Sequence, residues 1–157
     1  DRFMFRLDVS SPSATDLARI LTSTTGTTVT NTTARVSAAE LHQLQMLVRE
    51  VLCGSHLTRF VAELVVATHP TNAGNDEPTK RFVRYGASAR AGQAILLGAK
   101  ARALLAGRPA VVQEDIDACL LPALRHRVLL GFEADAEQIG VQDLLPDWLV
   151  RAQRMAR

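Results

Sequence analysis

The fold of this chain is most constrained by residues 89–106, which are apolar on nearly every side when they are placed on a helix. Ser88 precedes this run as a candidate N-cap, and Gly107 follows it as a helix stop. A helix without a polar face needs other elements to cover it all round. We therefore expect residues 89–106 to form the buried central helix of a bundle.

The composition favours an aliphatic, helical core. Hydrophobic residues make up 47% of the 157 residues, but aromatic residues make up only 4%. A β-sandwich usually draws on more aromatic and β-branched side chains. The length suits one compact domain, or one domain and a small part of another.

Capping signals and helical spacing predict further helices around the central one. Ser13 is a candidate N-cap for a helix over about 14–22 whose apolar side chains point inward, and Ser37 with Glu40 forms a capping box for a helix over 38–52. Apolar stripes predict three more helices, over 56–69, after the acidic pair at 114–115, and over 144–155. The inward side chains of the first helix are Leu17, Ile20 and Leu21.

The remaining segments are predicted to be a strand and two loops. Residues 2–9 alternate in part and favour a short strand. Residues 22–33 form a threonine-rich linker, and residues 70–81 form a polar, turn-rich excursion. A glycosylation sequon at 31–33 is attributed to chance, because no secretion signal accompanies it.

Charge and composition argue against several classes of function. The 18 basic and 16 acidic residues give a net charge of +2, which is too small to indicate a nucleic-acid-binding surface. The helices predicted over 38–52 and 56–69 resemble a helix-turn-helix motif in their spacing. However, the negative charge of Glu63 would be repelled by the phosphates of DNA. Without a signal peptide or a membrane-length apolar run, we expect a cytoplasmic protein that inserts into no membrane. We predict no nucleic-acid partner.

The cysteines and histidines suggest neither a metal site nor catalysis. Cys53 and Cys119 lie in apolar helical patterns and are expected to be reduced, buried thiols. His42, His56 and His69 are scattered and match no metal-ligand or catalytic spacing.

The start of the central helix carries the clearest functional signal. In the stretch Gly86-Ala87-Ser88-Ala89-Arg90-Ala91, Arg90 places a fixed cation in the first helical turn. The backbone N–H groups there already favour an anion, so an arginine at this point is disfavoured unless an anion is present. A phosphate would be attracted by both the arginine and the helix N-terminus. The segment is therefore predicted to sense a phosphate.

Four landmarks in order relate the chain to a known family. Together they span essentially its whole length. They are Asp1-Arg2-Phe3 with Arg6-Leu7-Asp8-Val9; Val36-Ser37 leading to Leu44-Gln45 and Val48-Arg49; Gly86-Ala87-Ser88-x-Arg90-Ala91; and Leu124-Arg125-His126-Arg127. With these landmarks the chain resembles the end of a MoxR-type AAA+ ATPase.

The resemblance implies a mainly α fold: a helical AAA+ lid of about five to six helices. Residues 1–12 would be the end of the α/β core with its last strand, and residues 13–157 would be the lid. The chain contains no phosphate loop of the form GxxxxGK[ST]. In the family, the P-loop, the Walker B acid and sensor 1 precede the point where this chain starts, so we expect it to be cut from a longer protein.

The resemblance also implies roles for three residues. Arg90 resembles the sensor-2 arginine, which reaches the γ-phosphate of ATP from the lid, with Ser88 beside it. Arg2 resembles the arginine finger, which acts on a neighbouring subunit's nucleotide. The full-length protein would bind ATP with Mg²⁺, assemble into a hexameric ring and remodel an unnamed client protein, as a chaperone does. The fragment alone is expected to be inactive.

The sequence departs from the family at two helix starts. The family commonly has proline where Ala89 stands and Thr-Pro where Val112-Gln113 stands. Alanine fits a helix but preorganises it less than proline does. Valine cannot cap a helix, and the acidic pair Glu114 and Asp115 is expected to compensate in part.

A non-enzymatic helical interaction module is the alternative hypothesis. In that case the segment 86–90 would be only a helix cap, and Arg2 would be a solvated residue at a strand end. The exposure and the partner of Arg90 distinguish the two hypotheses. A sensor should be exposed on the side of the N-terminal segment, whereas a module would pair it with a carboxylate on the back of the bundle. Arg125-His126-Arg127 is expected to make capping and core contacts.

Overall fold

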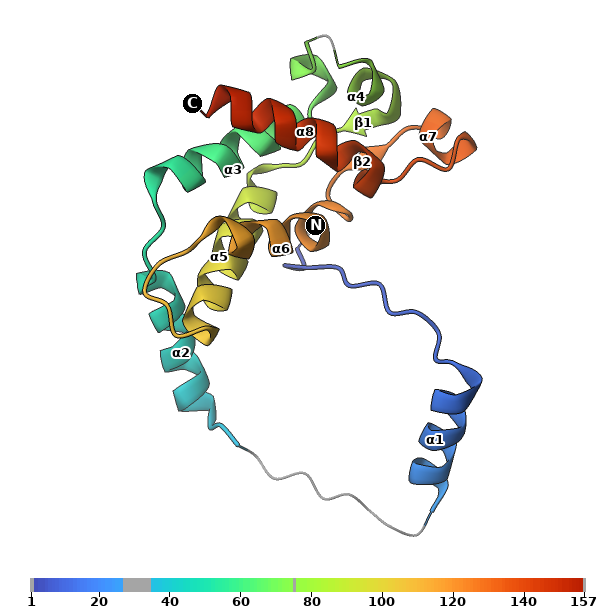
Figure 1. The fold of residues 1–157 in the computed structure, drawn as a ribbon, viewed down its shortest axis with the longest axis vertical. Helices are drawn as coiled ribbons and strands as arrows, with labels where there is room; N and C mark the ends of the chain where they lie inside the picture. Colours follow the sequence, from blue (N-terminus) through green and yellow to red (C-terminus); the bar gives the residue numbers. More distant parts are fainter. Residues whose placement is uncertain (1, 27–34, 75, 157) are drawn as a thin grey trace.

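The computed structural model describes residues 2–26, 35–74 and 76–156. These ranges contain eight α-helices, one 3₁₀ helix and two short strands (Figure 1). The elements are α1 (Ala14–Thr25), α2 (Ala38–Glu50), α3 (Ser55–Ala67), η1 (Pro70–Asn72), α4 (Glu77–Phe82), β1 (Val83–Tyr85), α5 (Ala89–Leu105), α6 (Gln113–Leu124), β2 (Leu129–Leu130), α7 (Phe132–Ala136) and α8 (Val141–Met155). The mainly α class is confirmed, and the six longer helices predicted from the sequence are all present.

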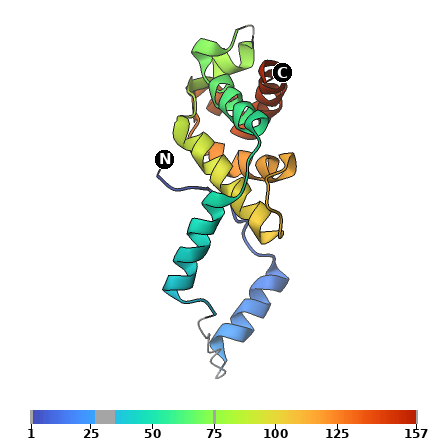
Figure 2. The same cartoon turned by 90° about the vertical axis from the view of Figure 1, so that its left-hand side faces the viewer.

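Helix α5 lies in the middle of the bundle, as predicted, and packs against both α3 and α6 (Figures 1 and 2). Its buried side chains are small, apart from one isoleucine, which lets neighbouring elements approach its axis. A Cβ atom on Gly98 would lie 2.9 Å from Sγ of Cys119 and would collide with the ring of Phe5. Glycine at this position therefore lets α6 and the N-terminal segment press directly on α5. The buried residues of α5 are Ala91, Ala94, Ile95, Gly98, Ala99 and Ala103.

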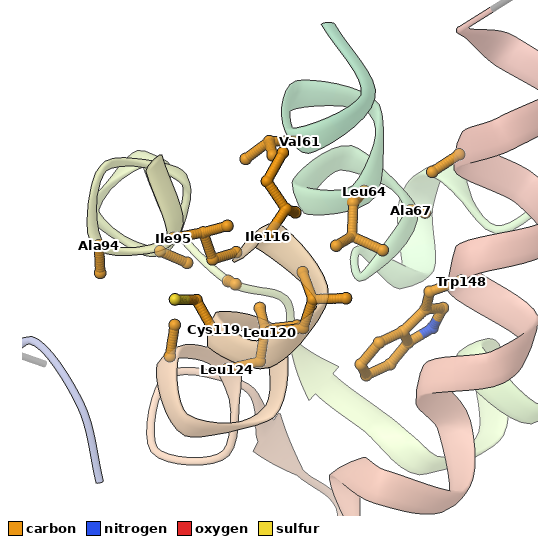
Figure 3. Close-up of a cluster of buried hydrophobic side chains, with 14 of the residues drawn as sticks. Val61, Leu64, Ala67, Ala94, Ile95, Ile116, Cys119, Leu120, Leu124 and Trp148 are labelled. Atoms are coloured by element: carbon orange, nitrogen blue, oxygen red, sulfur yellow. The ribbon is translucent and has the colours of Figure 1, made fainter. Parts of the chain in front are cut away.

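The core extends from the α5–α6 contact towards α8. Figure 3 shows Ile95, Ile116 and Leu120 gathered between α5 and α6, with Leu64 of α3 on the side that faces Trp148 of α8. All five side chains are buried. Burial of aliphatic and indole surface contributes about 25 cal/mol per Å² removed from water, so this cluster stabilises the contacts among α3, α5, α6 and α8.

Trp148 is also the end of a hydrogen-bonded chain that joins α8 to α4. Its Nε1–H donates to Oγ1 of Thr79 (2.7 Å), and the Thr79 hydroxyl donates to Oδ2 of Asp76 (2.5 Å). The same carboxylate oxygen accepts from Nη1 of Arg151 (2.8 Å), which also donates to the carbonyl oxygen of Ala67 (3.1 Å). Asp76 is the N-cap of α4. The segment 70–81, predicted as a polar loop, thus contains η1 and most of α4 and is tied to the core.

The predicted helix starts are largely confirmed. The Ser13 side chain accepts from the backbone N–H of Asp16, and Ser37 with Glu40 forms the predicted capping box. At α6, the Asp115 carboxylate accepts from the backbone N–H of Val112 (3.1 Å). Asp115 therefore supplies the cap that valine cannot provide.

The strand predicted over residues 2–9 is not formed. A strand needs a hydrogen-bonded neighbour, and the two described strands, β1 and β2, pair with each other in an antiparallel sheet. Residues 2–9 instead run as irregular chain past the end of α6, where the backbone N–H of Arg6 donates to the carbonyl oxygen of Pro122 (2.9 Å).

The inward orientation predicted for the apolar residues of the first helix is wrong. Leu17, Ile20 and Leu21 are 45–53% exposed, because α1 stands apart from the bundle (Figure 1). The apolar stripe of α2 is likewise exposed. Helical spacing identifies a face that can be buried, but it does not provide the element that covers it. Residues 22–25 of the threonine-rich linker belong to α1, and its remainder from 27 onward, with the sequon, lies outside the described residues.

The cysteines match the prediction in part. Neither forms a disulfide; Cys119 is buried, and Cys53 is half-buried. Burial raises the pKa of the Cys119 thiol above its ordinary value, so this thiol is a packing group at neutral pH. In the described ranges, no helix is both long and apolar enough to cross a membrane.

Replacing Thr79 by valine tests the bonded chain at Trp148. Valine keeps the shape of threonine but leaves the buried indole N–H without an acceptor. We expect Thr79→Val to lower the free energy of unfolding by about 1–3 kcal/mol, measured by urea denaturation. The matched control Thr58→Val, at an exposed threonine of α3, should change it by less than about 0.5 kcal/mol. Equal effects of the two changes would contradict the role assigned to Thr79.

The ion pair at the start of α6 predicts a pH dependence of stability. Asp115 is 2% exposed and bonded to both terminal nitrogens of Arg108, at 2.6 and 2.7 Å. The Arg108 guanidinium lowers the pKa of this carboxyl below its ordinary value. Since the pKa is lower in the folded than in the unfolded state, the stabilisation is complete above the unfolded pKa of about 4. It is lost as the pH falls through the folded pKa.

We therefore expect the free energy of unfolding to decrease at pH values under about 4. Asp115→Asn should make this decrease smaller. At pH 7 the same variant should be less stable than the wild type. The control Asp117→Asn, at an exposed aspartate of α6, should keep the acid response of the wild type. Urea titrations between pH 2 and 7 measure both, and an unchanged acid response in Asp115→Asn would refute the assignment.

Candidate functional site

The start of α5 is held in place by the end of α3. The backbone N–H of Ala87 donates to Oγ1 of Thr68 (2.9 Å), and Nε2 of His69 donates to the carbonyl oxygen of Ala87 (2.9 Å). Ala87 and Thr68 are fully buried. Both backbone groups of the residue before the N-cap are thus bonded to the two residues that follow α3, and these bonds position the first turn of α5.

Gly86 is required by the same contact. A Cβ atom there would lie 2.7 Å from Cγ and 2.9 Å from Cα of His69, closer than real Cβ contacts allow. The glycine of the segment 86–91 therefore lets the chain pass against His69 before α5 begins. Neither His69 nor Thr68 was predicted as a site residue, because their partner is a backbone group 18 or 19 residues away.

Ser88 and Arg90 are both exposed at the start of α5. Ser88 occupies the predicted N-cap position, with φ −80° and ψ 173°, but its side chain makes no capping bond. Arg90 is the second residue of the helix, so its guanidinium extends from the turn whose N–H groups point outward. The first turn of α5 holds no acidic side chain. This combination of a helix N-terminus and an exposed arginine suits a phosphate.

A second group of hydrogen-bond donors lies just after α6 and contacts the N-terminal segment. Nε2 of His126 donates to the carbonyl oxygen of Phe3 (2.9 Å), and Nη1 of Arg127 donates to the carbonyl oxygen of Met4 (2.9 Å). Nη1 of Arg127 also donates to the carbonyl oxygen of Ala123 (2.7 Å), which is the predicted capping contact.

The positive charge of Arg90 acts on Arg127. Burial, and after it the positive charge of Arg90, lowers the pKa of Arg127. The guanidinium of Arg127 nevertheless stays charged at neutral pH, because the ordinary pKa of arginine lies far above 7. One positive charge from the first turn of α5 and one from the residues after α6 thus lie on the side of the molecule that faces the N-terminal segment.

Arg2 is exposed and directly precedes Phe3, whose carbonyl oxygen is bonded to both His126 and Arg127. The structure therefore brings the Arg2 segment to the same side as Arg90, although the two residues are 88 positions apart in the sequence. A group of three or more His, Cys, Asp or Glu side chains that could hold a metal ion does not occur in the described part of the chain.

Comparison with known proteins agrees with this architecture. Residues 77–148 match the family model of the AAA lid domain. The chain is 30% identical over 140 residues to Chaperone MoxR1 of Mycobacterium tuberculosis, covering 89% of this chain and 37% of that protein. It is 35% identical over 96 residues to Protein MoxR of Paracoccus denitrificans, covering 56% of this chain and 28% of that protein.

A solved structure shares the fold. A crystal structure of a protein of Cytophaga hutchinsonii, assigned as an ATPase, superposes with a TM-score of 0.86 at 25% identity, covering 96% of this chain and 46% of that chain. The chain spans only about a third of the length of the curated relatives. It belongs to the MoxR-type AAA+ ATPases, as a C-terminal part that contains the helical lid.

Proposed function

We propose that this chain is the part of a MoxR-like ATPase that senses the γ-phosphate of ATP and couples hydrolysis to movement of the lid. The observation that carries the proposal is the placement of Arg90. It extends from the first turn of α5, whose position α3 fixes, on the side where Arg127 meets the N-terminal segment. A helix N-terminus and a guanidinium favour the same anion, and guanidinium can bind two phosphate oxygens at once.

Three residues have roles in this proposal. Arg90 binds the γ-phosphate as the sensor-2 arginine, and the hydroxyl of Ser88 lies at the same helix start. Arg2 is the arginine finger, which stabilises the charge that spreads over the transferred phosphoryl group in a neighbouring subunit. The division between residues 1–12 as the end of the α/β core and 13–157 as the lid also remains a prediction.

ATP fits the residues at the start of α5, because they offer positive charge and N–H donors to a polyphosphate. Magnesium, when bound, bridges the phosphate oxygens and neutralises charge that develops on them. We assign it no ligand in this chain. We propose further that the full-length protein forms a hexameric ring in the cytoplasm and remodels client proteins, since the curated relative from M. tuberculosis is named a chaperone. Neither nucleic acid nor a membrane is part of this proposal.

Replacing Arg90 by alanine in the full-length protein tests the sensor role. Charge-assisted hydrogen bonds are each worth about 1.5–3 kcal/mol, so we expect ATP turnover to fall on the order of 10- to 100-fold. Arg90→Lys should restore part of it, because lysine keeps the charge but loses the bidentate geometry. The control Arg59→Ala, at an exposed arginine of α3, should keep wild-type turnover. Wild-type turnover in Arg90→Ala would reject the sensor role and favour the non-enzymatic module.

We also expect the 157-residue chain alone to hydrolyse no ATP, because its sequence has no phosphate loop to hold the nucleotide. A phosphate-release assay with the purified chain measures this, with the full-length protein as the positive control. Turnover by the chain that Arg90→Ala abolishes would overturn the proposal that catalysis needs the rest of the ATPase.

A further inference from the structure

The segment that carries Arg2 is fastened to the end of α6 at several consecutive residues. The carbonyl oxygens of Phe3 and Met4 accept from His126 and Arg127, and the N–H of Arg6 donates to the carbonyl oxygen of Pro122. The attachment therefore uses the backbone of the segment as well as its side chains. Two further contacts are the ring of Phe5 over Gly98 and the ion pair between Asp8 and Arg125.

These contacts meet a physical requirement of the helix. The last turn of an α-helix leaves carbonyl groups without partners inside the helix. At the end of α6, the carbonyl oxygen of Pro122 accepts from the N-terminal segment, and that of Ala123 accepts from Arg127. Arg127 thus bonds α6 and the segment at once, so the two must move together.

Arg127 also lies within the electrostatic range of Arg90. The positive charge of Arg90 contributes to the lowered pKa of Arg127, after burial. An anion bound at Arg90 would offset this repulsion.

We infer that His126 and Arg127 are positioning residues for Arg2: they fix the backbone of residues 3 and 4 to the lid, so that the lid carries the arginine finger with it. The inference rests on the proposed function, and in particular on the role of Arg2. It assigns the sequence Arg125-His126-Arg127 a part in the ATPase cycle beyond capping α6.

A double-mutant cycle in the full-length ring tests the inference, with Arg2→Ala, Arg127→Met and the double variant. Loss of an arginine finger lowers kcat on the order of 10³–10⁵-fold. Misplacement of a catalytic group by about 1 Å costs on the order of 10²-fold, so we expect Arg127→Met to lower kcat about 10- to 100-fold. The affinity for a fluorescent ATP analogue should change by less than kcat does, since Arg127 holds the finger and acts on the phosphate site only through its charge.

The decisive readout is the effect of Arg127→Met when Arg2 is already alanine. A residue that acts through Arg2 has nothing left to position, so the second change should lower kcat less than about twofold. A residue with only a structural role would lower kcat by the same factor in both backgrounds. The control Arg59→Met should keep wild-type kcat, and the unfolding temperature of each variant verifies that it is folded.

Each outcome decides one point. Independent losses in the cycle, unchanged kcat in Arg127→Met, or a loss of nucleotide affinity as large as the loss of kcat would overturn the positioning role while leaving the sensor role of Arg90 intact. Wild-type kcat in Arg2→Ala would reject the finger itself, and with it this inference.

If Arg127→Met does not fold, the same cycle is run with Arg127→Lys. Lysine keeps the charge but offers a single nitrogen to two carbonyl groups. A smaller loss of kcat that disappears in the Arg2→Ala background is then expected, and a loss that persists there counts against the inference.

Discussion

The burial of α5 on nearly all sides is the constraint on which the rest of the structure depends. A helix made of alanine and other small residues has no polar face to leave in water and little side-chain volume of its own. It must be covered by larger side chains from its neighbours, such as Ile116 and Leu120 of α6 and Val61 of α3. The close approach at Gly98 extends this cover to Phe5 of the N-terminal segment. The same packing that stabilises α5 thereby determines where the functional side chains lie.

Local signals in the sequence were sufficient for much of the fold. Helices with a capping side chain and an apolar stripe, such as α1 and α2, formed where those signals predicted them, because the signals lie within a few residues of each other. The prediction of a strand over residues 2–9 was wrong, because strand formation depends on residues far away in the sequence. An alternating pattern states only that a segment can pair, and whether it does so depends on a neighbour elsewhere in the chain. The short α4 was missed because its six residues are too few for a helical pattern, and the bond from Trp148 to Thr79 that ties it to α8 is tertiary.

In the candidate site, too, some features could be predicted from the sequence and others could not. The cation at Arg90 and the helix start at Ser88 follow from sequence, since a capped helix with arginine in its first turn is a local pattern. The support of that turn by Thr68 and His69 could not be predicted, because it joins side chains to a backbone group on another element. The nearness of Arg127 to Arg90 is likewise a product of packing between α5 and α6. Sequence resemblance proposed the roles, and tertiary structure supplied the geometry that makes them testable.

Sensor and finger candidates in one small region have a mechanical consequence. The start of α5, which carries Arg90, is bonded to the two residues after α3, and the segment after Arg2 is bonded to the end of α6, which packs on α5. In the proposed function, a phosphate that binds at Arg90 would therefore act on a body that includes the attachment of the proposed finger, without requiring a separate signalling path through the protein. Loss of the phosphate would release one attraction and restore the repulsion between Arg90 and Arg127. The energy available for moving the lid is thus set by how differently its two positions bind that phosphate.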